Sequence, residues 1–96
     1  MFRIIIPTLA IFLLVASCTN PPVSRAVVTG TNPELLKLRA GPGLGYNVIL
    51  GLPDGTVVIR RECITEVGEL WCRVSLAAAP SVTGFVAARY LSDARS

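Results

Sequence analysis

The chain has 96 residues, which makes one small domain the upper limit of its organisation. It contains no histidine, so Ser-His-Asp and Cys-His nucleophilic arrangements and the commonest metal ligand are excluded. The formal net charge is +3, a mild excess of basic residues that does not by itself predict a nucleic-acid partner.

Residues 1–17 have the pattern of a cleaved, helical secretory signal peptide. Arg3 precedes an apolar run that ends in small residues, and the run is too short for a membrane-spanning helix. It closes with Leu14-Val15-Ala16-Ser17-Cys18, which resembles the lipobox of bacterial lipoproteins. That resemblance implies cleavage after Ser17 and acylation of Cys18, for example with palmitate, so that membrane lipid becomes a partner. The alternative is an ordinary signal peptide followed by a chance cysteine.

Residues 18–33 are rich in proline and polar residues, and we expect them to form a flexible lipidated tether. Fully extended, the tether would reach on the order of 50 Å. Val27-Val28 is at best a marginal strand within it. Residue 19 is threonine and not aspartate, which by resemblance to the sorting rule of Gram-negative lipoproteins favours the outer membrane. The expected localisation is a lipid-anchored, periplasm-facing position in the cell envelope.

The folded domain is expected over residues 34–96. Leu36, Leu38 and Ala40 alternate with basic residues, which predicts a half-buried strand that ends at Gly41-Pro42-Gly43. A short strand over 48–50 follows, and then a turn at Pro53-Asp54-Gly55.

The next two strands, 56–64 and 71–76, are expected to form a hairpin with a two-residue turn at Val67-Gly68. Simple alternation places Val57, Ile59 and Cys63 on one face of the first strand. The turn sets a register with Cys63 opposite Cys72 at a non-hydrogen-bonded pair, where side chains lie closest. We therefore predict a disulfide between them, with two buried free thiols as the alternative. The same register sets Glu62 against Arg73 and Glu66 against Glu69, and a bulge would shift it.

An alanine-rich loop over 77–82 precedes a strand over 84–87. A 3₁₀ turn at Ala88-Arg89-Tyr90 and a closing Tyr90-Leu91 follow, and the residues after them are expected to fray.

Several short motifs follow one another in an order that resembles the pattern of the bacterial SH3 (SH3b) family. They are Leu38-Arg39-Ala40-Gly41-Pro42, Leu52-Pro53-Asp54-Gly55-Thr56, Trp71-Cys72-Arg73-Val74, Gly84-Phe85-Val86 and Tyr90-Leu91. The resemblance covers roughly residues 36–92 and implies an all-β fold, a small five-stranded SH3-like barrel with a short 3₁₀ turn. The chain departs from the family pattern in the long connection over 76–83 and in having Phe85 where tryptophan is usual.

The ligand-binding candidates are two aromatic residues, Tyr46 and Trp71, with Arg39 and Asp54 close to them in the motifs. Trp71 lies on the strand face opposite Cys72, so we expect it to be partly exposed, and an exposed aromatic can hold a peptide or sugar. The competing interpretation is that Tyr46 and Trp71 pack over the ends of the barrel, while Phe85 and Tyr90 fill it. We expect no metal site and no cofactor, because three cysteines with one lipidated cannot close a zinc site.

These observations indicate a non-enzymatic module. The favoured function is binding of a cell-wall component, most simply the peptide part of peptidoglycan, by a membrane-anchored SH3b domain. The alternative is an accessory lipoprotein that docks on an envelope protein through its alanine-rich loop or an exposed strand edge. Neither interpretation involves nucleic acid.

Overall fold

The computed structural model describes residues 23–94, which form one antiparallel sheet of seven strands. The strands are β1 (Ser24–Val28), β2 (Leu36–Arg39), β3 (Val48–Leu52), β4 (Val57–Glu66), β5 (Glu69–Leu76), β6 (Thr83–Ala87) and β7 (Leu91–Asp93). A 3₁₀ turn, η1 (Ala88–Tyr90), joins β6 to β7 as the sequence predicts. The all-β class is confirmed. The expected number of five strands is wrong, because β1 and β7 both join the sheet.

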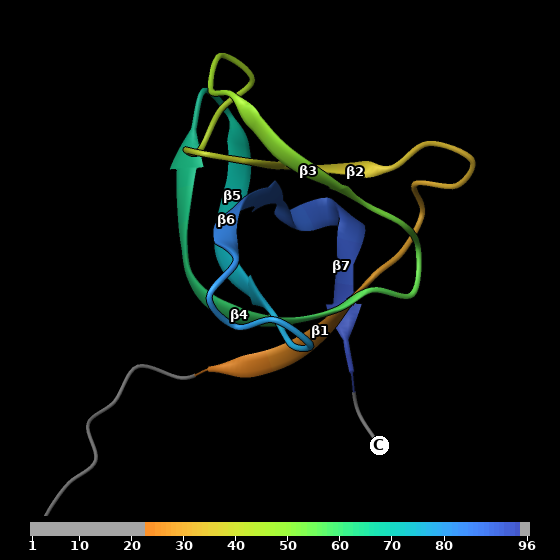
Figure 1. The fold of residues 1–96 in the computed structure, drawn as a ribbon. Coiled ribbons are helices and arrows are strands. Elements are labelled where there is room, and N and C mark those ends of the chain that lie inside the picture. Colours follow the sequence, from red (N-terminus) through yellow and green to blue (C-terminus); the bar gives the residue numbers. More distant parts are fainter. Residues whose placement is uncertain (1–22, 95–96) are drawn as a thin grey trace, which may run out of the picture.

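The sheet has the order β3-β2-β6-β5-β4-β1-β7 and curls strongly, so that β2 and β3 lie across the core from β1 and β7 (Figure 1). The curl brings the turn after β3 onto β1: the Gly55 amide donates to the Val28 carbonyl at 2.8 Å, and the Val28 amide donates to the Thr56 carbonyl at 2.9 Å. One core therefore collects side chains from six strands.

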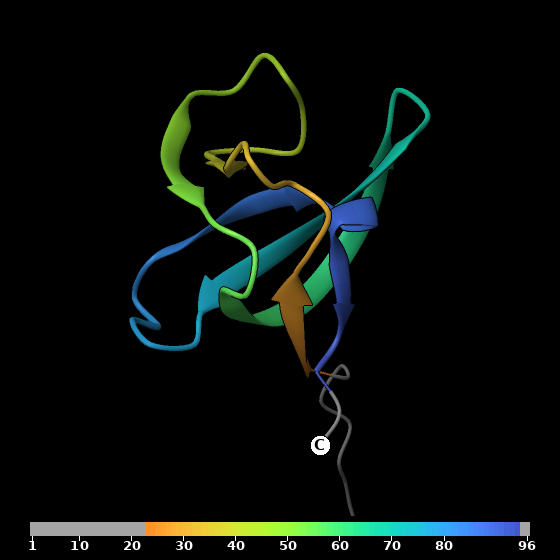
Figure 2. The same ribbon diagram turned by 90° about the vertical axis from the view of Figure 1, so that its right-hand side faces the viewer.

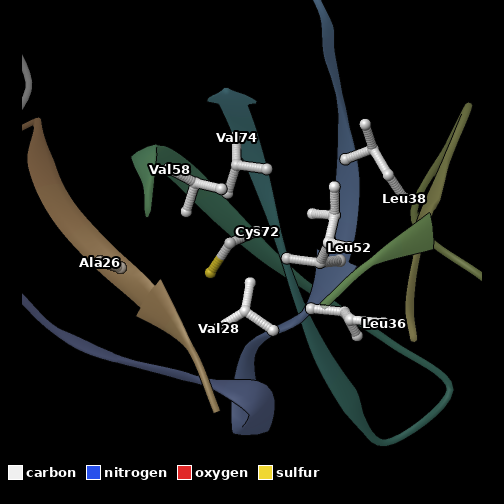
Figure 3. Close-up of a cluster of buried hydrophobic side chains, with 9 residues drawn as sticks. Ala26, Val28, Leu36, Leu38, Leu52, Val58, Cys72 and Val74 are labelled. Carbon is white, nitrogen blue, oxygen red and sulfur yellow. The ribbon is translucent and has the colours of Figure 1, made fainter. Parts of the chain in front are cut away.

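The core is aliphatic and small. Val28, Leu38, Val58, Val74 and Val86 are fully buried, and Ala26, Leu36, Leu52 and Cys72 complete the cluster (Figure 3). Burying one such valine or leucine side chain stabilises a fold by about 1.5–3 kcal/mol. Tyr90 packs against this cluster as expected, whereas Phe85 lies on the outer face of β6, between buried neighbours that face inward.

β1 corrects the expected extent of the tether. Ala26 and Val28 have no exposed surface, and β1 pairs with β4 through Ser24↔Arg60 and with β7 through Val28↔Leu91. Residues 24–33 therefore belong to the folded domain. The prediction failed because a five-residue strand flanked by prolines carries too little pattern of its own, and its partners lie far away in the sequence. The signal peptide, Cys18 and the remainder of the tether lie outside the described residues.

The β4–β5 hairpin has the predicted turn. Glu66 pairs with Glu69 and Cys63 with Cys72, and Val67 and Gly68 both have positive φ (50° and 75°), which is the signature of a type I′ turn. Beyond Cys63 a bulge shifts the register, so that Arg60 pairs with Val74. The bulge changes which residues point inward. Val58, and not Val57 or Ile59, belongs to the core, together with Cys72.

Gly84 is where β6 passes closest to β2. A Cβ at this position would lie 2.7 Å from the Arg39 carbonyl oxygen and 2.8 Å from Leu38 Cγ. Only a glycine fits this crossing without displacing the backbone of β2.

Candidate functional site

A groove of about 470 Å³ opens at one end of the sheet, on the outer face of β5 and β6. It is lined by the segment that follows β1, by β2 and by η1. The lining residues are Gly30, Thr31, Glu34, Leu35, Leu36, Lys37, Arg39, Leu44, Glu69, Trp71, Ala87, Arg89 and Tyr90. This volume falls in the range of sites that hold a small ligand or a few residues of a chain.

Trp71 is the one aromatic of β5, and it borders this groove. It lies on the face opposite Cys72, as predicted, and pairs across the sheet with Ala87 of β6. The residue is nevertheless only 5% exposed, so the expectation of a partly exposed tryptophan is wrong. Gly30, Thr31, residues 34–37 and η1 line the groove together with it, and the sequence pattern of β5 carries no information about these distant elements.

Arg39 combines a position in the groove with a structural task. Its Nη1 donates to the carbonyl oxygens of Leu44 at 3.1 Å and Tyr46 at 3.0 Å. These bonds fix the loop between β2 and β3 and place Leu44 on the edge of the groove. Nη1 of the guanidinium is thus occupied by hydrogen bonds within the chain.

Tyr46 is 50% exposed but does not line the groove. Its ring covers Gly41, where any Cβ would overlap the ring atoms. The glycines of the Gly41-Pro42-Gly43 turn therefore make room for this ring as well as for the turn. Tyr46 stays accessible on the loop next to Leu44.

Asp54 does not line the groove, in contrast to Arg39 and Trp71. Its carboxylate accepts hydrogen bonds from Thr31 Oγ1 at 2.6 Å, from the Thr31 amide at 2.9 Å and from the Asn32 amide at 3.3 Å. The hydrogen bond from the Thr31 hydroxyl, followed by that from the Thr31 amide, lowers the pKa of Asp54 below its ordinary value of 3.8. These hydrogen bonds hold the segment after β1 against the turn after β3, which is a structural role for Asp54. We call them the Asp54 clasp.

Charged residues that the sequence did not single out form the rim of the groove. Arg89 pairs with Glu69, and its guanidinium lies 5.0 Å from the centre of the Tyr90 ring. Glu34 and Lys37 are exposed and line the same groove. From the sequence alone, Glu69 is only the partner of Glu66 in a like-charged pair near the hairpin tip. The sequence signal for this rim is weak, because its members come from β2, the loop before β2, β5 and η1, which only the folded chain brings together.

The hairpin carries the predicted disulfide. Cys63 and Cys72 are bonded, and their Cα atoms lie 3.9 Å apart. Cys63 is exposed, while Cys72 is 1% exposed and belongs to the core. Beside them Glu62 accepts two hydrogen bonds from Arg73, at 2.6 and 3.0 Å, which confirms the expected ion pair and lowers the pKa of Glu62.

Within residues 23–94, no group of three or more cysteine, aspartate or glutamate side chains is placed to hold a metal ion. The same part of the chain has no helix with the length and apolar character needed to cross a membrane.

Comparison with protein-family models, with curated proteins and with solved structures found no match to this chain. The case for its function therefore depends on the groove and on the motifs.

Proposed function

We propose that the chain is a lipid-anchored envelope protein whose SH3-like barrel binds a cell-wall peptide in the groove above Trp71. The observation that carries the proposal is a groove bordered by an aromatic side chain and rimmed by charges of both signs. The half-buried ring of Tyr90, which lines the groove with Trp71, provides apolar contact, and rim charges select the orientation of a polar ligand. The anchor is the acylated Cys18 of the lipobox-like segment.

The chemistry of the rim favours a peptide over a uniformly charged polymer. Lys37, Arg39 and Arg89 are cationic, whereas Glu34 and Glu69 are anionic. A short peptide with both free carboxylates and free amines can satisfy both signs at once. A polyanion such as nucleic acid would meet two carboxylates in the same groove, which disfavours it.

The test is co-sedimentation of the oxidised domain with purified cell-wall sacculi. The protein is residues 19–96, because a version that begins at residue 34 would lack β1. We expect saturable pelleting that K37E reduces about tenfold or more, since a hydrogen bond to a charged group contributes roughly 1.5–3 kcal/mol. Trp71→Ala is a poor probe, because Trp71 is buried and its loss would unsettle the fold.

The matched control is R25E, which makes the same change of charge on an exposed residue of β1 outside the groove. It should pellet like the wild type. Equal loss of pelleting in K37E and R25E would indicate non-specific attraction to the wall, and absence of pelleting at high micromolar protein would rule the proposal out.

A second candidate function is docking on an envelope protein, and the edge strand β3 favours it. β3 stands at one end of the sheet order, and Val48, Ile49 and Leu50 are 46%, 49% and 39% exposed. Its sequence contains no charged residue and no proline, the usual protections of a free edge. The alanine-rich loop is the weaker docking element, because it is closed by its own bonds from Ala79 to Leu76 and from Val82 to Ala79.

Crosslinking in intact cells distinguishes the two functions. Ile49→Lys should abolish a crosslinked partner and leave pelleting with sacculi unchanged if β3 is the docking edge. A crosslinked partner that survives Ile49→Lys but is lost with K37E would instead assign the partner to the groove.

A further inference from the structure

β1 determines how far the domain can stand from an anchor at Cys18. Ser24 is already paired with Arg60, so only residues 19–23 separate Cys18 from the sheet. Six residue steps span at most about 20 Å when fully extended. This is less than half the reach of a tether that ran to residue 33.

The direction of β1 determines which end of the domain this short connection holds. Ser24 lies at one end of the sheet, and β1 runs from there towards Gly30 and Thr31, which line the groove. β7 runs in the opposite sense, from Leu91 beside Val28 to Asp93 beside Ala26. Figure 2 shows the start of β1 and the end of β7 on one side of the molecule, with the 40–47 loop and the tip of the β4–β5 hairpin on the opposite side.

We call the first of these sides the chain-end face and define it by Val23, Ser24, Arg25, Arg60 and Asp93. Val23 is 52% exposed and Arg25 is also exposed. Arg60 donates to Ser24 Oγ at 3.1 Å and to Asp93 Oδ1 at 2.8 Å, which balances one negative charge. None of the ion pairs found within residues 23–94 involves Arg25, so the face retains a net positive charge beside an apolar side chain.

We propose that the chain-end face lies against an anionic membrane surface and that the groove opens away from it. Because the connection to Cys18 is short, it holds this face close to the lipid. Arg25 then contacts the phosphate headgroups, and Val23 contacts the apolar boundary beneath them. β1 is ~13 Å long, so the groove lies about that much farther from the membrane than Ser24 does. The orientation depends on the proposed anchor at Cys18, and it adds that ligands approach from the side away from the membrane.

The first experiment attaches the lipid chemically, so that it does not depend on acylation in the cell. Cys63 and Cys72 are bonded to each other, which leaves Cys18 as the free thiol of residues 18–96 for coupling to a maleimide lipid in anionic vesicles. Trp71 is the only tryptophan and reports the groove end. The V23W/W71F double variant moves that reporter to the chain-end face.

Energy transfer to a headgroup-labelled acceptor lipid should be stronger from the double variant than from the wild type. Inserting ten glycine and serine residues between Pro22 and Val23 should reduce that difference. Equal transfer from both positions without the insertion, or stronger transfer from Trp71, would overturn the proposal. Retained far-ultraviolet circular dichroism checks that the double variant is folded.

The second experiment avoids the tryptophan substitution. The unanchored domain, residues 19–96, is mixed with anionic vesicles of phosphatidylglycerol and phosphatidylethanolamine. R25E should weaken its partition on the order of tenfold, because it removes a basic residue that the anionic headgroups attract and adds an acidic residue that they repel. K37E makes the same change at the groove and should leave the partition unchanged, so a loss with K37E and not with R25E would reverse the proposed orientation.

These outcomes are independent of wall binding. If sacculi fail to pellet the domain but R25E still weakens the vesicle contact, the groove function is wrong and the orientation stands. If acyl chains are not found on Cys18 in cells, the anchor is wrong even where the chemically anchored domain shows the expected polarity.

Discussion

The β4–β5 hairpin and β1 lie side by side in the sheet but are held there by different means. The hairpin is stabilised by contacts within its own sequence: a two-residue turn, a disulfide over a separation of 9 residues and the Glu62–Arg73 ion pair. β1 has no such local support. It is held by buried Ala26 and Val28 and by partners far along the chain, such as Arg60 at a separation of 36 residues.

The difference shows how a domain of about 70 residues reaches stability with a small core. Local cross-links lower the conformational entropy of the unfolded hairpin and so favour the folded state. β1 stabilises the fold differently, by closing one side of the core. Losing a cross-link should weaken the fold by a limited amount. Losing β1 should open the core itself.

Removing β1 should have the largest effect. A protein that begins at residue 34 loses the buried side chains of Ala26 and Val28 and uncovers Val58, the partner of Ala26 in β4. A small domain has only about 5–15 kcal/mol of stability in total, so we expect no cooperative thermal transition by circular dichroism. The matched protein that begins at residue 23 should unfold cooperatively. Equal unfolding curves for the two would show that β1 is not part of the stable domain.

Removing the disulfide should have a smaller effect. C63A/C72A should lower the free energy of unfolding by about 2–3 kcal/mol, because the short closed loop regains its freedom in the unfolded state. Urea unfolding measures this, and the reduced wild type serves as a control that avoids the cavity at Cys72. A loss as complete as that of the shortened protein would mean that the hairpin, and not β1, controls closure of the core.

Relieving the hairpin turn should stabilise the protein. Val67 has φ of 50° and a fully exposed side chain, so it gains no packing in return for a left-handed backbone. Val67→Asn should raise the free energy of unfolding by about 1 kcal/mol, because asparagine tolerates this conformation. Val67→Thr keeps a β-branched side chain and should give little or no gain. A stability unchanged by asparagine would show that the turn is not a strained point.

The smallest effect should come from the Asp54 clasp, and it should depend on pH. The folded pKa of Asp54 lies below its ordinary value of 3.8, so the clasp stabilises fully above that pH. Its contribution is lost as the pH falls through the lower folded pKa. The difference in thermal stability between the wild type and Asp54→Asn should therefore be constant from pH 5 to 8 and shrink below about pH 4.

Glu62→Gln is the parallel variant on the hairpin, because the pKa of Glu62 is also lowered, chiefly by its hydrogen bond to Arg73. The difference in thermal stability between the wild type and Glu62→Gln should shrink over the same acidic range. A difference that grew on acidification, for either residue, would contradict the direction of its pKa shift.

The sequence by itself determined the features whose partners lie within one hairpin. The Val67-Gly68 turn, the pairing of Cys63 with Cys72 and the disulfide followed from alternation and turn chemistry over a few residues. The 3₁₀ turn before Leu91 was predicted as a short connector, and the all-β class was predicted from the resemblance of the motifs to the SH3b family. The SH3-like barrel, the signal peptide and the lipidation of Cys18 remain predictions.

The tertiary structure decided everything that depends on residues far apart in the chain. β1 looked like part of a tether because its hydrogen-bonding partners lie in β4 and β7. Trp71 looked exposed because residues 30–31, 34–37 and η1, which line the groove with it, are remote in sequence. Asp54 accepts hydrogen bonds from Thr31, 23 residues earlier in the chain, and does not line the groove, and the bulge in β4 brings Val58 into the core. Short-range patterns record which residues can form a strand, whereas the closing of a curled sheet selects which strands meet and which side chains they bury.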